Sequence, residues 1–426
     1  MYPSRTAYSD SLNFFGDQSP GELVARFGSP LYVYNEAVLR RRCRDMKNLA
    51  RVPGFVACYS TKANGNPSLL RIIREEGLIA DAMSPGEMLM LRLAGFSREQ
   101  ICYVSNNVSA RELELASVEA AHVSVDSLSQ LESFGRLRPG LSVMLRVNPG
   151  IGAGHHAKVV TAGKDTKFGI SPDDFAQMRD ILRRHDLRLV GINQHVGSLF
   201  MDAAPFLEAA AWLLDTARDF PGIRLIDFGG GFGIPYRKYE GEKPLDLEEL
   251  GAKFTALLAG YRKETGYDGQ FIIEPGRYVT AECAILLGTV HAVKNNGPTR
   301  YVGTDLGFTI LARPMMYDSF HDVELYPADD TRRPNMVQTV VGNICESGDI
   351  LAKDRELPEA REGDLVGVLD AGAYGMAMSS NYNQRLRPAE VLVGGDAQAR
   401  LIRRRDSLED LQAVYPDHAP DPSAEA

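Results

Sequence analysis

The sequence predicts an α/β fold, with a closed (β/α)8 barrel of the TIM type followed by a second, mainly β domain of the sandwich or barrel type. Eight strand-like apolar runs lie between residues 55 and 276, and amphipathic helix-like segments separate them. After residue 277, strand-like runs continue with few helical periods. A doubly wound open sheet also alternates strands and helices, but the count of eight favours the closed barrel.

The barrel runs are mostly continuous rather than alternating, as is typical of parallel strands covered on both faces. They are Phe55–Lys62, Leu78–Ser84, Ile101–Asn106, His122–Asp126, Ser142–Asn148, Leu189–Gly197, Arg224–Gly229 and Phe271–Gly276. The helix-like segments mostly open with Ser, Pro or Asp, and several close with Gly. They are Pro67–Gly77, Pro85–Gly95, Ser109–Glu119, Leu128–Leu137, Ser171–His185, Pro205–Phe220 and Asp246–Gly266. A strand, Pro30–Asn35, and a helix, Glu36–Arg51, precede them, so we expect the barrel domain to span residues 36–277.

The β domain is predicted from further runs with strand character. They are Ala284–Val293, Tyr301–Asp305, Val337–Val341, Asp364–Leu369, Glu390–Val393 and Ala399–Ile402. The early strand Leu31–Tyr34 is expected to join them, so this domain combines residues 1–35 with residues 278–415. Residues 416–426 are rich in Pro, Asp, Ala and Ser and are predicted to form a disordered tail.

Composition argues against several kinds of partner. The formal net charge of −9 and the pI near 5.5 argue against nucleic acid or an anionic membrane. The five cysteines are scattered and form no CxxC pair, so neither a disulfide framework nor a zinc site is indicated. No apolar stretch approaches the ~20 residues of a membrane span. Residues 1–17 lack the apolar core of a signal peptide, so we expect a protein of the reduced cytoplasm with a small-molecule partner.

The residues that end the predicted barrel strands point to one cofactor. In such barrels the active site gathers at the C-terminal ends of the strands. The strands deliver Lys62, Asp81, Ser84, His195, Ser198, Gly229–Gly231 and Glu274–Arg277 to that end. An amine can form a Schiff base with an aldehyde, glycines let backbone N–H groups approach a phosphate, and a carboxylate can keep a pyridine nitrogen protonated. The set favours pyridoxal phosphate.

Taken singly, each of these residues has a plainer explanation. Lys62 could be a surface charge, and His195 could be a core histidine. Gly229–Gly231 could form a turn, and Glu274 could pair with Arg277 in a salt bridge. The functional interpretation is favoured because a barrel makes all four strand ends neighbours.

Two loops of the predicted β domain also carry reactive groups. Gly342–Asp349 packs a thiol and two carboxylates between glycines, and Asp370–Gly375 presents a tyrosine among small residues. Either loop could be structural, because cysteine is often a small buried hydrophobe and tyrosine often fills a turn. His155 and His156 have no accompanying ligand set, so no metal site is predicted.

With these residues, the chain resembles the fold type III pyridoxal-phosphate decarboxylases and, among them, most closely the diaminopimelate decarboxylases. The resemblance extends from about Ser29 to about Asp410. Its most specific stretches are Tyr59–Asn64 (YSTKAN), His195–Ser198 (HVGS), Asp227–Gly233 (DFGGGFG), Glu274–Arg277 (EPGR), Cys345–Asp349 (CESGD), Asp370–Gly375 (DAGAYG) and Arg387–Val393 (RPAEVLV). One such motif is a weak signal, whereas the ordered set is a strong one.

The resemblance implies roles for individual residues. Lys62 would hold pyridoxal 5'-phosphate covalently, His195 would stack on its ring, and Glu274 would face the pyridine nitrogen. The other implied cofactor contacts are Ser198, Gly230, Gly231, Gly276, Arg277 and Tyr374. The implied substrate contacts are Arg277, Arg313, Tyr317, Glu346, Asp349 and Tyr374. Cys345, as proton donor and third catalytic residue beside Lys62 and His195, would reach a neighbouring subunit with Glu346, which predicts a homodimer with shared active sites.

The same resemblance implies a reaction, the decarboxylation of meso-2,6-diaminopimelate to L-lysine in the last step of lysine biosynthesis. The alternative is a sister decarboxylase of the same fold acting on ornithine, lysine, carboxynorspermidine or a D-amino acid. Arg313 and Tyr317 favour a substrate with a second carboxylate. An isomerase like alanine racemase is a further alternative, but Glu274 favours an electron sink that such enzymes avoid. A non-catalytic cofactor carrier is disfavoured because Lys62 and Cys345 are both present.

Three positions depart from the commonest pattern of this family. The loop Gly150–Lys164 has a sequence that differs from the one usual in the family, whereas Lys167–Ile170 just after it matches the family. Asn343 stands where proline is usual, and Leu199 follows the HVGS motif where glutamine is common. The loop and Leu199 are expected near the substrate, so they bear on specificity more than on reaction type.

Overall fold

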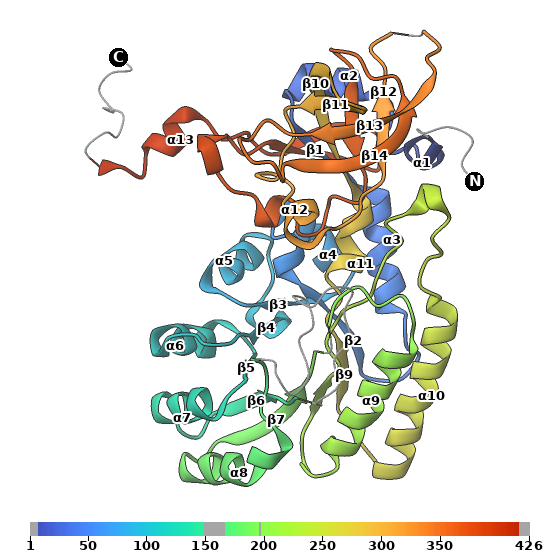
Figure 1. Cartoon of the computed structure of the whole chain (residues 1–426). Helices are drawn as coiled ribbons and strands as arrows, with labels where there is room; N and C mark the ends of the chain where they lie inside the picture. The colour runs from blue at the N-terminus through green and yellow to red at the C-terminus, as the bar shows by residue number, and fades with distance from the viewer. Residues whose placement is uncertain (1–6, 149–166, 196, 330, 417–426) are drawn as a thin grey trace. The chain divides into compact units, whose positions relative to one another are not determined.

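The computed structural model describes residues 7–148, 167–195, 197–329 and 331–416 of the chain. The chain divides into two compact units (Figure 1). The barrel unit comprises Leu39–Pro235 and Lys243–Thr280, and the β unit comprises Met1–Val38, Tyr236–Glu242 and Ala281–Ala426. The segment Tyr236–Glu242, expected within the barrel domain, is thus part of the β unit. Of the predicted tail, only Pro416 lies within the described residues.

The described part of the barrel unit contains a closed barrel of eight strands, in which every neighbouring pair is parallel. The strands are β2 (Phe55–Ser60), β3 (Ile79–Ala82), β4 (Ile101–Val104), β5 (His122–Val125), β6 (Ser142–Arg146), β7 (Arg188–Asn193), β8 (Leu225–Asp227) and β9 (Gln270–Ile273). The barrel closes where Phe55 of β2 lies opposite Phe271 of β9. Six of the strands fall within a predicted run, and β7 and β9 each begin one residue before theirs, at Arg188 and Gln270. The predicted fold class is confirmed.

Helices cover the outside of the barrel (Figure 1). They are α3 (Glu36–Lys47), α4 (Pro67–Glu75), α5 (Pro85–Leu93), α6 (Ala110–Glu119), α7 (Leu128–Leu137), α8 (Phe175–Arg184), α9 (Ala204–Ala217) and α10 (Leu247–Thr265). Side-chain caps start several of them: Ser84, Ser109 and Ser127 each accept the N–H three residues later at 3.2–3.3 Å. Because these caps fix where each helix begins, the preceding loops that carry the strand-end residues are short and defined.

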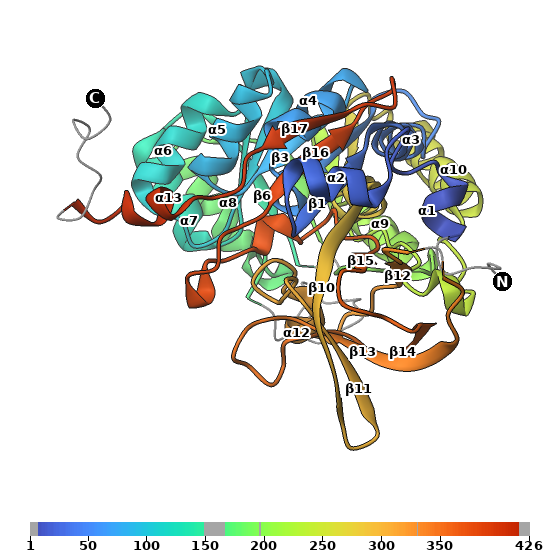
Figure 2. The same cartoon turned by 90° about the horizontal axis from the view of Figure 1, so that it is seen from above.

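The described β unit contains a nine-stranded sheet in which β1 is central. The strands are β1 (Leu31–Asn35), β10 (Ala284–Asn296), β11 (Thr299–Thr304), β12 (Val323–Tyr326), β13 (Asn335–Val341), β14 (Ile350–Pro358), β15 (Leu365–Val368), β16 (Ala389–Val393) and β17 (Ala399–Arg403). β1 pairs antiparallel with β10 and parallel with β16, and β10 and β11 form a long two-stranded ribbon (Figure 2). The short helices of this unit are α1 (Ala7–Ser11), α2 (Pro20–Phe27), α12 (Arg313–Tyr317) and α13 (Leu408–Gln412).

Two strands of the β unit, β12 and β14, were not predicted from the sequence. β14 ends the sheet, and its middle, Lys353–Glu356, consists of charged residues. An edge strand pairs on one side only and often carries charge, so its apolar signal is weak. β12 has four residues, too few for a clear period. Short or charged edge strands are therefore the part of this fold that the apolar pattern missed.

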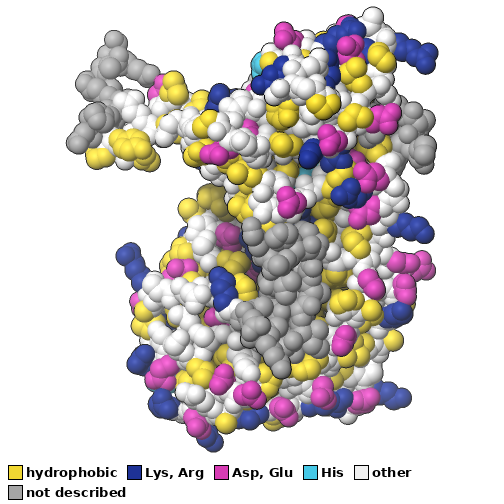
Figure 3. Space-filling view, viewed as in Figure 1, with side chains coloured by type: hydrophobic (Ala, Val, Ile, Leu, Met, Phe, Trp, Pro, Cys, Tyr) yellow, Lys and Arg dark blue, Asp and Glu magenta, His cyan; other side chains and the backbone are white. Residues whose placement is uncertain are grey.

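Charged side chains of both signs are interspersed with apolar ones on the face shown in Figure 3. This agrees with the modest net charge of −9 on 426 residues. Among the described residues, no helix combines the length and the apolar character needed to cross a lipid bilayer.

Candidate active site

The end of β2 places a lysine next to buried acidic groups. Lys62 lies in a single 3₁₀ turn, Thr61–Ala63, directly after β2. Ser60 of β2 lies opposite Asp81 of β3, and the Ser60 hydroxyl donates to Asp81 Oδ2 at 2.7 Å. Burial and the charge of Glu274 raise the pKa of Asp81 well above its usual value, and Lys62 opposes that shift. The amine therefore lies at the C-terminal end of the strands, where a barrel gathers its chemistry.

His195, which follows β7, is held in one tautomer. The Gly230 N–H donates to His195 Nδ1 at 3.2 Å, so the proton of the neutral ring lies on Nε2. Burial, followed by the positive charges of Lys62 and Arg146, holds the pKa of His195 well below its ordinary value. A neutral ring of fixed orientation suits stacking against another ring and does not suit binding an anion.

The glycines after β8 allow backbone to pass where side chains could not. A Cβ on Gly230 would lie 2.0 Å from the carbonyl oxygen of Glu274. Gly231 has a φ of +108°, in the region that favours glycine. Within the described part of the chain, the N–H groups of Gly231 and Gly276 donate to no acceptor. Two backbone donors thus lie just after β8 and β9, which suits a phosphate group.

Glu274 follows β9 and carries a buried oxygen without a partner. The residue is 7% exposed, and its Oε1 has no hydrogen-bond partner among the described residues. Buried polar atoms are almost always hydrogen-bonded, because an unpaired one loses its hydration without replacement. The oxygen therefore indicates a donor supplied by a ligand, and a protonated ring nitrogen is such a donor.

Arg277 opens a short helix, α11 (Arg277–Thr280), at the same end of the barrel. Its Nη2 donates to the Ser198 hydroxyl at 3.0 Å, which joins the residues after β9 to those after β7. The neighbouring Leu199 has a φ of +65°, a conformation that costs a residue with a Cβ. A buried guanidinium in this position can bind a carboxylate or a phosphate.

Three further charged residues end barrel strands, although the sequence analysis did not select them. Arg146 ends β6, Asp227 ends β8, and Asp126 follows β5. Burial and the nearby Glu274 raise the pKa of Asp227 well above its usual value. Burial lowers the pKa of Arg146, and Glu274 is the largest of the acids that oppose the shift. A search of the strand ends for any charged residue would have found all three.

In the β unit, a thiol and a carboxylate share one exposed loop. The Cys345 thiol and backbone N–H both face Asn383 Oδ1 at 3.5 Å. The Tyr382 hydroxyl donates to Glu346 Oε1 at 2.7 Å. Cys345 and Glu346 are both exposed, so the loop presents them to solvent from a defined position. Tyr382 and Asn383 carried no signal in the sequence.

Asp349 braces the same loop. Its carboxylate accepts the Phe308 N–H at 2.7 Å and the Ile344 N–H at 2.9 Å. Burial raises its pKa, and the two backbone donors oppose the shift. This geometry accounts for an acid at position 349 as a loop brace, and its implied contact with substrate stays a prediction.

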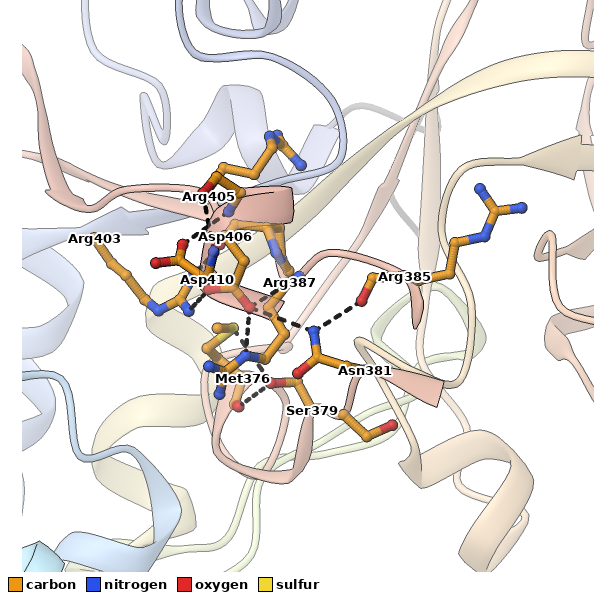
Figure 4. Close-up of polar contacts among 12 residues, drawn as sticks. Met376, Ser379, Asn381, Arg385, Arg387, Arg403, Arg405, Asp406 and Asp410 are labelled. Carbon is orange, nitrogen blue, oxygen red and sulfur yellow. Dashed lines mark hydrogen bonds and ion pairs between the residues drawn. The ribbon is translucent and has the colours of Figure 1, made fainter. Parts of the chain in front are cut away.

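A second acid, Asp406, holds the segment that contacts Cys345 (Figure 4). Arg387 Nε donates to Asp406 Oδ2 at 2.8 Å, and Arg403 binds the other carboxylate oxygen. Asn381 Nδ2 also reaches Asp406 Oδ2, at 3.4 Å. Burial acts against the charged form of Asp406, but the two arginines outweigh it, so its pKa lies below the usual value. The segment with Asn381 and Asn383 is thereby fixed to the end of the sheet.

The loop that carries Tyr374 begins at a buried ion pair. Lys238 Nζ lies 2.7 Å from Asp370 Oδ2 and 3.3 Å from Glu282 Oε1, and all three side chains are buried. Burial raises the pKa of Asp370 to about 7, against the opposing charge of Lys238. Asp370 and Tyr374 both have positive φ, +58° and +57°, so the loop is held in a conformation that costs non-glycine residues.

Arg313 and Tyr317 begin and end helix α12. Arg313 is 2% exposed, and its guanidinium carbon lies 4.6 Å from the centre of the Tyr236 ring. Tyr236 belongs to the segment Tyr236–Glu242, which lies between β8 and α10 in the sequence but is part of the β unit. The arginine implied for a substrate carboxylate is thus a buried group in a defined setting.

The structure brings the predicted residues together as two sets, one in each unit. The barrel unit holds Lys62, His195, Ser198, Gly230, Gly231, Glu274, Gly276 and Arg277 at its strand ends. The β unit holds Arg313, Tyr317, Cys345, Glu346, Asp349 and Tyr374. The altered loop Gly150–Lys164, with His155 and His156, lies outside the described residues, as does Val196 of the HVGS motif.

Comparison with known proteins identifies relatives of the whole chain. Residues 36–281 match the family model described as pyridoxal-dependent decarboxylase, pyridoxal binding domain. A diaminopimelate decarboxylase of Methanothermobacter thermautotrophicus is 38% identical over 96% of this chain and 97% of its own. The diaminopimelate decarboxylase of Escherichia coli K12 is 35% identical over 92% of this chain and 95% of its own.

Solved structures agree with the sequence relatives. A crystal structure of diaminopimelate decarboxylase matches with a TM-score of 0.85 at 35% identity, covering 92% of this chain and 94% of that one. The Helicobacter pylori enzyme in complex with L-lysine matches with a TM-score of 0.85 at 28% identity, covering 93% and 99%. A lysine/ornithine decarboxylase of Vibrio vulnificus, at 22% identity and a TM-score of 0.75, shares the fold.

Proposed function

The chain belongs to the pyridoxal-dependent decarboxylases, and from this premise we propose that it converts meso-2,6-diaminopimelate to L-lysine and CO2. The observation that carries the reaction type is the strand-end set of the barrel, where Lys62 lies with the buried, partnerless oxygen of Glu274. The choice of substrate is supported by relatives named diaminopimelate decarboxylase, which match this chain over nearly their whole length. Enzymes of this kind are carboxy-lyases.

The residues present fit pyridoxal 5'-phosphate. Lys62 would supply the amine for its aldehyde, and Glu274 Oε1 would accept from its ring nitrogen. The N–H groups of Gly231 and Gly276 would donate to its phosphate, and Tyr374 is proposed as a further contact. The cofactor, when bound, supplies an electron-withdrawing ring that accepts the electron pair left by the departing CO2. His195 is proposed to lie against that ring, which its neutral state allows.

The side chains divide the remaining work between binding and proton transfer. Arg277, at the barrel end with Ser198, is proposed for the carboxylate of the reacting carbon or for the phosphate. Lys62, at the end of β2, would hold the cofactor through its amine. The Cys345 thiol, oriented by Asn383 Oδ1, is proposed to return a proton to the carbon that lost CO2.

A second carboxylate on the substrate explains the arginine of the β unit. Arg313 and Tyr317 are proposed to bind that carboxylate, and Glu346 is proposed to bind the distal amino group. A site with polar groups placed for both ends rejects an analogue that leaves them unpaired by roughly 10⁴-fold. Ornithine or lysine as substrate would leave Arg313 without a carboxylate, because each has only the one that is lost.

We also propose a homodimer in which Cys345 and Glu346 complete the site of the partner subunit. The exposure of both residues on a loop braced by Asp349 supports this, since an exposed reactive thiol on a rigid loop suits insertion into another surface. A reduced compartment such as the cytoplasm is proposed as its location, because none of the five cysteines, each within the described residues, forms a disulfide.

The test is CO2 release by the purified protein with added pyridoxal phosphate, with meso-diaminopimelate compared with ornithine, lysine and carboxynorspermidine. Turnover confined to meso-diaminopimelate, with lysine as product, is expected. Turnover of a different amino acid with none of meso-diaminopimelate would keep the reaction type and reject the substrate. The specificity question would then move to Leu199 and to Gly150–Lys164.

A further inference from the structure

A histidine in the β unit contacts both the arginine and the loop that the proposed function uses. His321 is fully buried, and its ring nitrogens have two close partners. Its Nε2 lies 2.7 Å from Arg313 Nη1, and its Nδ1 lies 2.7 Å from the carbonyl oxygen of Leu369. Leu369 directly precedes the loop that carries Tyr374. All of these residues belong to the β unit.

The two contacts fix the protonation of His321. A carbonyl oxygen can only accept, so Nδ1 must carry the proton that bonds to Leu369. A guanidinium can only donate, so Nε2 must present its lone pair to Arg313. The ring is therefore neutral with the proton on Nδ1, and a protonated ring would set N–H against N–H. In this state the histidine links the Leu369 backbone to the guanidinium.

The surroundings of Arg313 restrict it further. Tyr236 packs edge-on against the His321 ring at 5.1 Å and lies under the Arg313 guanidinium at 4.6 Å. Arg313 Nη2 also donates to the Ser319 hydroxyl at 3.3 Å. An arginine side chain has many rotamers, so a buried acceptor that fixes the guanidinium in place lowers the entropic cost of binding a carboxylate.

We propose that His321 is a positioning residue that orients Arg313 toward the substrate carboxylate surviving the reaction. This inference rests on the proposed function. Loss of CO2 from one end of meso-diaminopimelate leaves the other carboxylate on L-lysine, so L-lysine keeps the group that Arg313 binds. Cadaverine is L-lysine without that carboxylate. The two ligands therefore differ by the one group whose binding depends on His321.

The experiment measures KM and kcat for meso-diaminopimelate and the inhibition constants of L-lysine and cadaverine, with holoenzyme carrying His321→Phe. Phenylalanine keeps a planar aromatic side chain and removes both nitrogens. KM and the inhibition constant of L-lysine should rise roughly 10- to 100-fold, because a charged donor loses its acceptor. The inhibition constant of cadaverine should change by less than about threefold, because cadaverine has no carboxylate for Arg313. The kcat should stay similar, because the surviving carboxylate is bound equally in the ground state and in the transition state.

Two further variants separate positioning from structural support. His291→Phe removes an exposed histidine of the same unit and should leave all four constants unchanged. His321→Gln keeps an acceptor for Arg313 and loses the bond to Leu369, so L-lysine inhibition should fall between the wild type and His321→Phe. Should the phenylalanine variant fail to fold, the glutamine variant carries the test alone, through the L-lysine to cadaverine ratio.

Equal weakening of L-lysine and cadaverine would overturn the inference, as would an unchanged constant for L-lysine in a folded variant. Failure of the proposed function would look different. The wild-type enzyme would then release no CO2 from meso-diaminopimelate, whatever stands at position 321.

Discussion

The barrel unit and the β unit fix their candidate site residues by different means. In the barrel, Lys62, His195 and Glu274 each lie within two residues of a strand end, so the register of the parallel strands sets their positions. In the β unit, Arg313 lies in a five-residue helix, and Cys345 and Tyr374 lie in loops. Their positions depend on side-chain contacts, because no ladder of backbone hydrogen bonds runs through them.

The difference has a consequence for mutations. A substitution at a strand end of the barrel removes a chemical group and leaves its supporting strand intact. A substitution in the networks of the β unit removes the support of a group that stays in the chain. Barrel variants should therefore lose turnover at nearly constant stability, whereas network variants of the β unit should lose stability or binding first.

The largest effect is expected for Lys62→Ala. Turnover should fall by roughly 10⁴-fold or more, because the amine that is proposed to bond to the cofactor is removed. The absorbance band of the lysine-bound cofactor should vanish, and the melting temperature of the apoprotein should hardly change. CO2 release and a pyridoxal-phosphate titration measure both. The matched control is Lys253→Ala on the surface of α10, and retained turnover in Lys62→Ala would remove the cofactor assignment.

The next largest effect is a loss of stability on mutation of a buried ion pair in the β unit. Lys238→Met leaves Asp370 and Glu282 buried without their cation. Breaking a buried pair in this way typically costs roughly 3–5 kcal/mol. Chemical unfolding of the apoprotein should show a loss of that size, whereas the exposed Lys253→Met should show almost none. Equal unfolding free energies for the two variants would contradict the network account.

Glu274→Gln tests the barrel unit, where turnover should fall. An amide keeps the shape of the side chain and loses the charge that is proposed to keep the ring nitrogen protonated. kcat should fall by roughly 10²- to 10³-fold with KM changed much less, because the charge acts on the transition state rather than on binding. Steady-state kinetics with Glu264→Gln, an exposed glutamate in α10, supplies the control. A selective rise in KM would instead make Glu274 a substrate contact.

Much of this arrangement was visible in the sequence, for a physical reason. A strand buried on both faces leaves a long apolar run, and its end is marked where polar residues begin, as at Lys62 and Glu274. Arg146 and Asp227 also stand where an apolar run gives way to polar residues, but they have no counterpart in the set of residues expected for pyridoxal phosphate. The positions of the barrel residues at the strand ends were thus predictable from the pattern, whereas their roles stay predictions.

The networks of the β unit were not predictable in this way. His321 contacts Arg313, eight residues away, and Leu369, 48 residues away. Lys238 meets Asp370 across 132 residues, from a segment that interrupts the barrel sequence. Such contacts depend on how strands pair in three dimensions, and no local period of the chain encodes them. The motif resemblance included Tyr374 and Cys345 together with Asp349 and Asp370, but it did not indicate Lys238, Asn383 or Asp406.

Cys345→Ala should reduce kcat by roughly 10- to 100-fold through the loss of the proposed proton donor, with the cofactor still bound. The same variant tests the shared site. Mixing it with Lys62→Ala and allowing subunits to exchange should restore about one quarter of wild-type turnover, because half of the dimers are mixed and each has one intact site. Loss of cofactor in the cysteine variant, or no recovery on mixing, would contradict the proposed placement.

The smallest effect concerns His195 and the pH dependence of stability. Its pKa in the folded protein lies well below the value of about 6.5 expected when the chain is unfolded. The unfolded state therefore binds more protons in that interval, so the stability contribution is complete above about pH 6.5 and is lost as pH falls. Each pH unit in the interval costs at most about 1.4 kcal/mol. The free energy of unfolding of the apoprotein, measured at about pH 7.5 and 5.5, should fall more for the wild type than for His195→Gln. Equal decreases for the two proteins would mean that the His195 ring takes up protons in the folded state as it does in the unfolded state, and would contradict the lowered pKa.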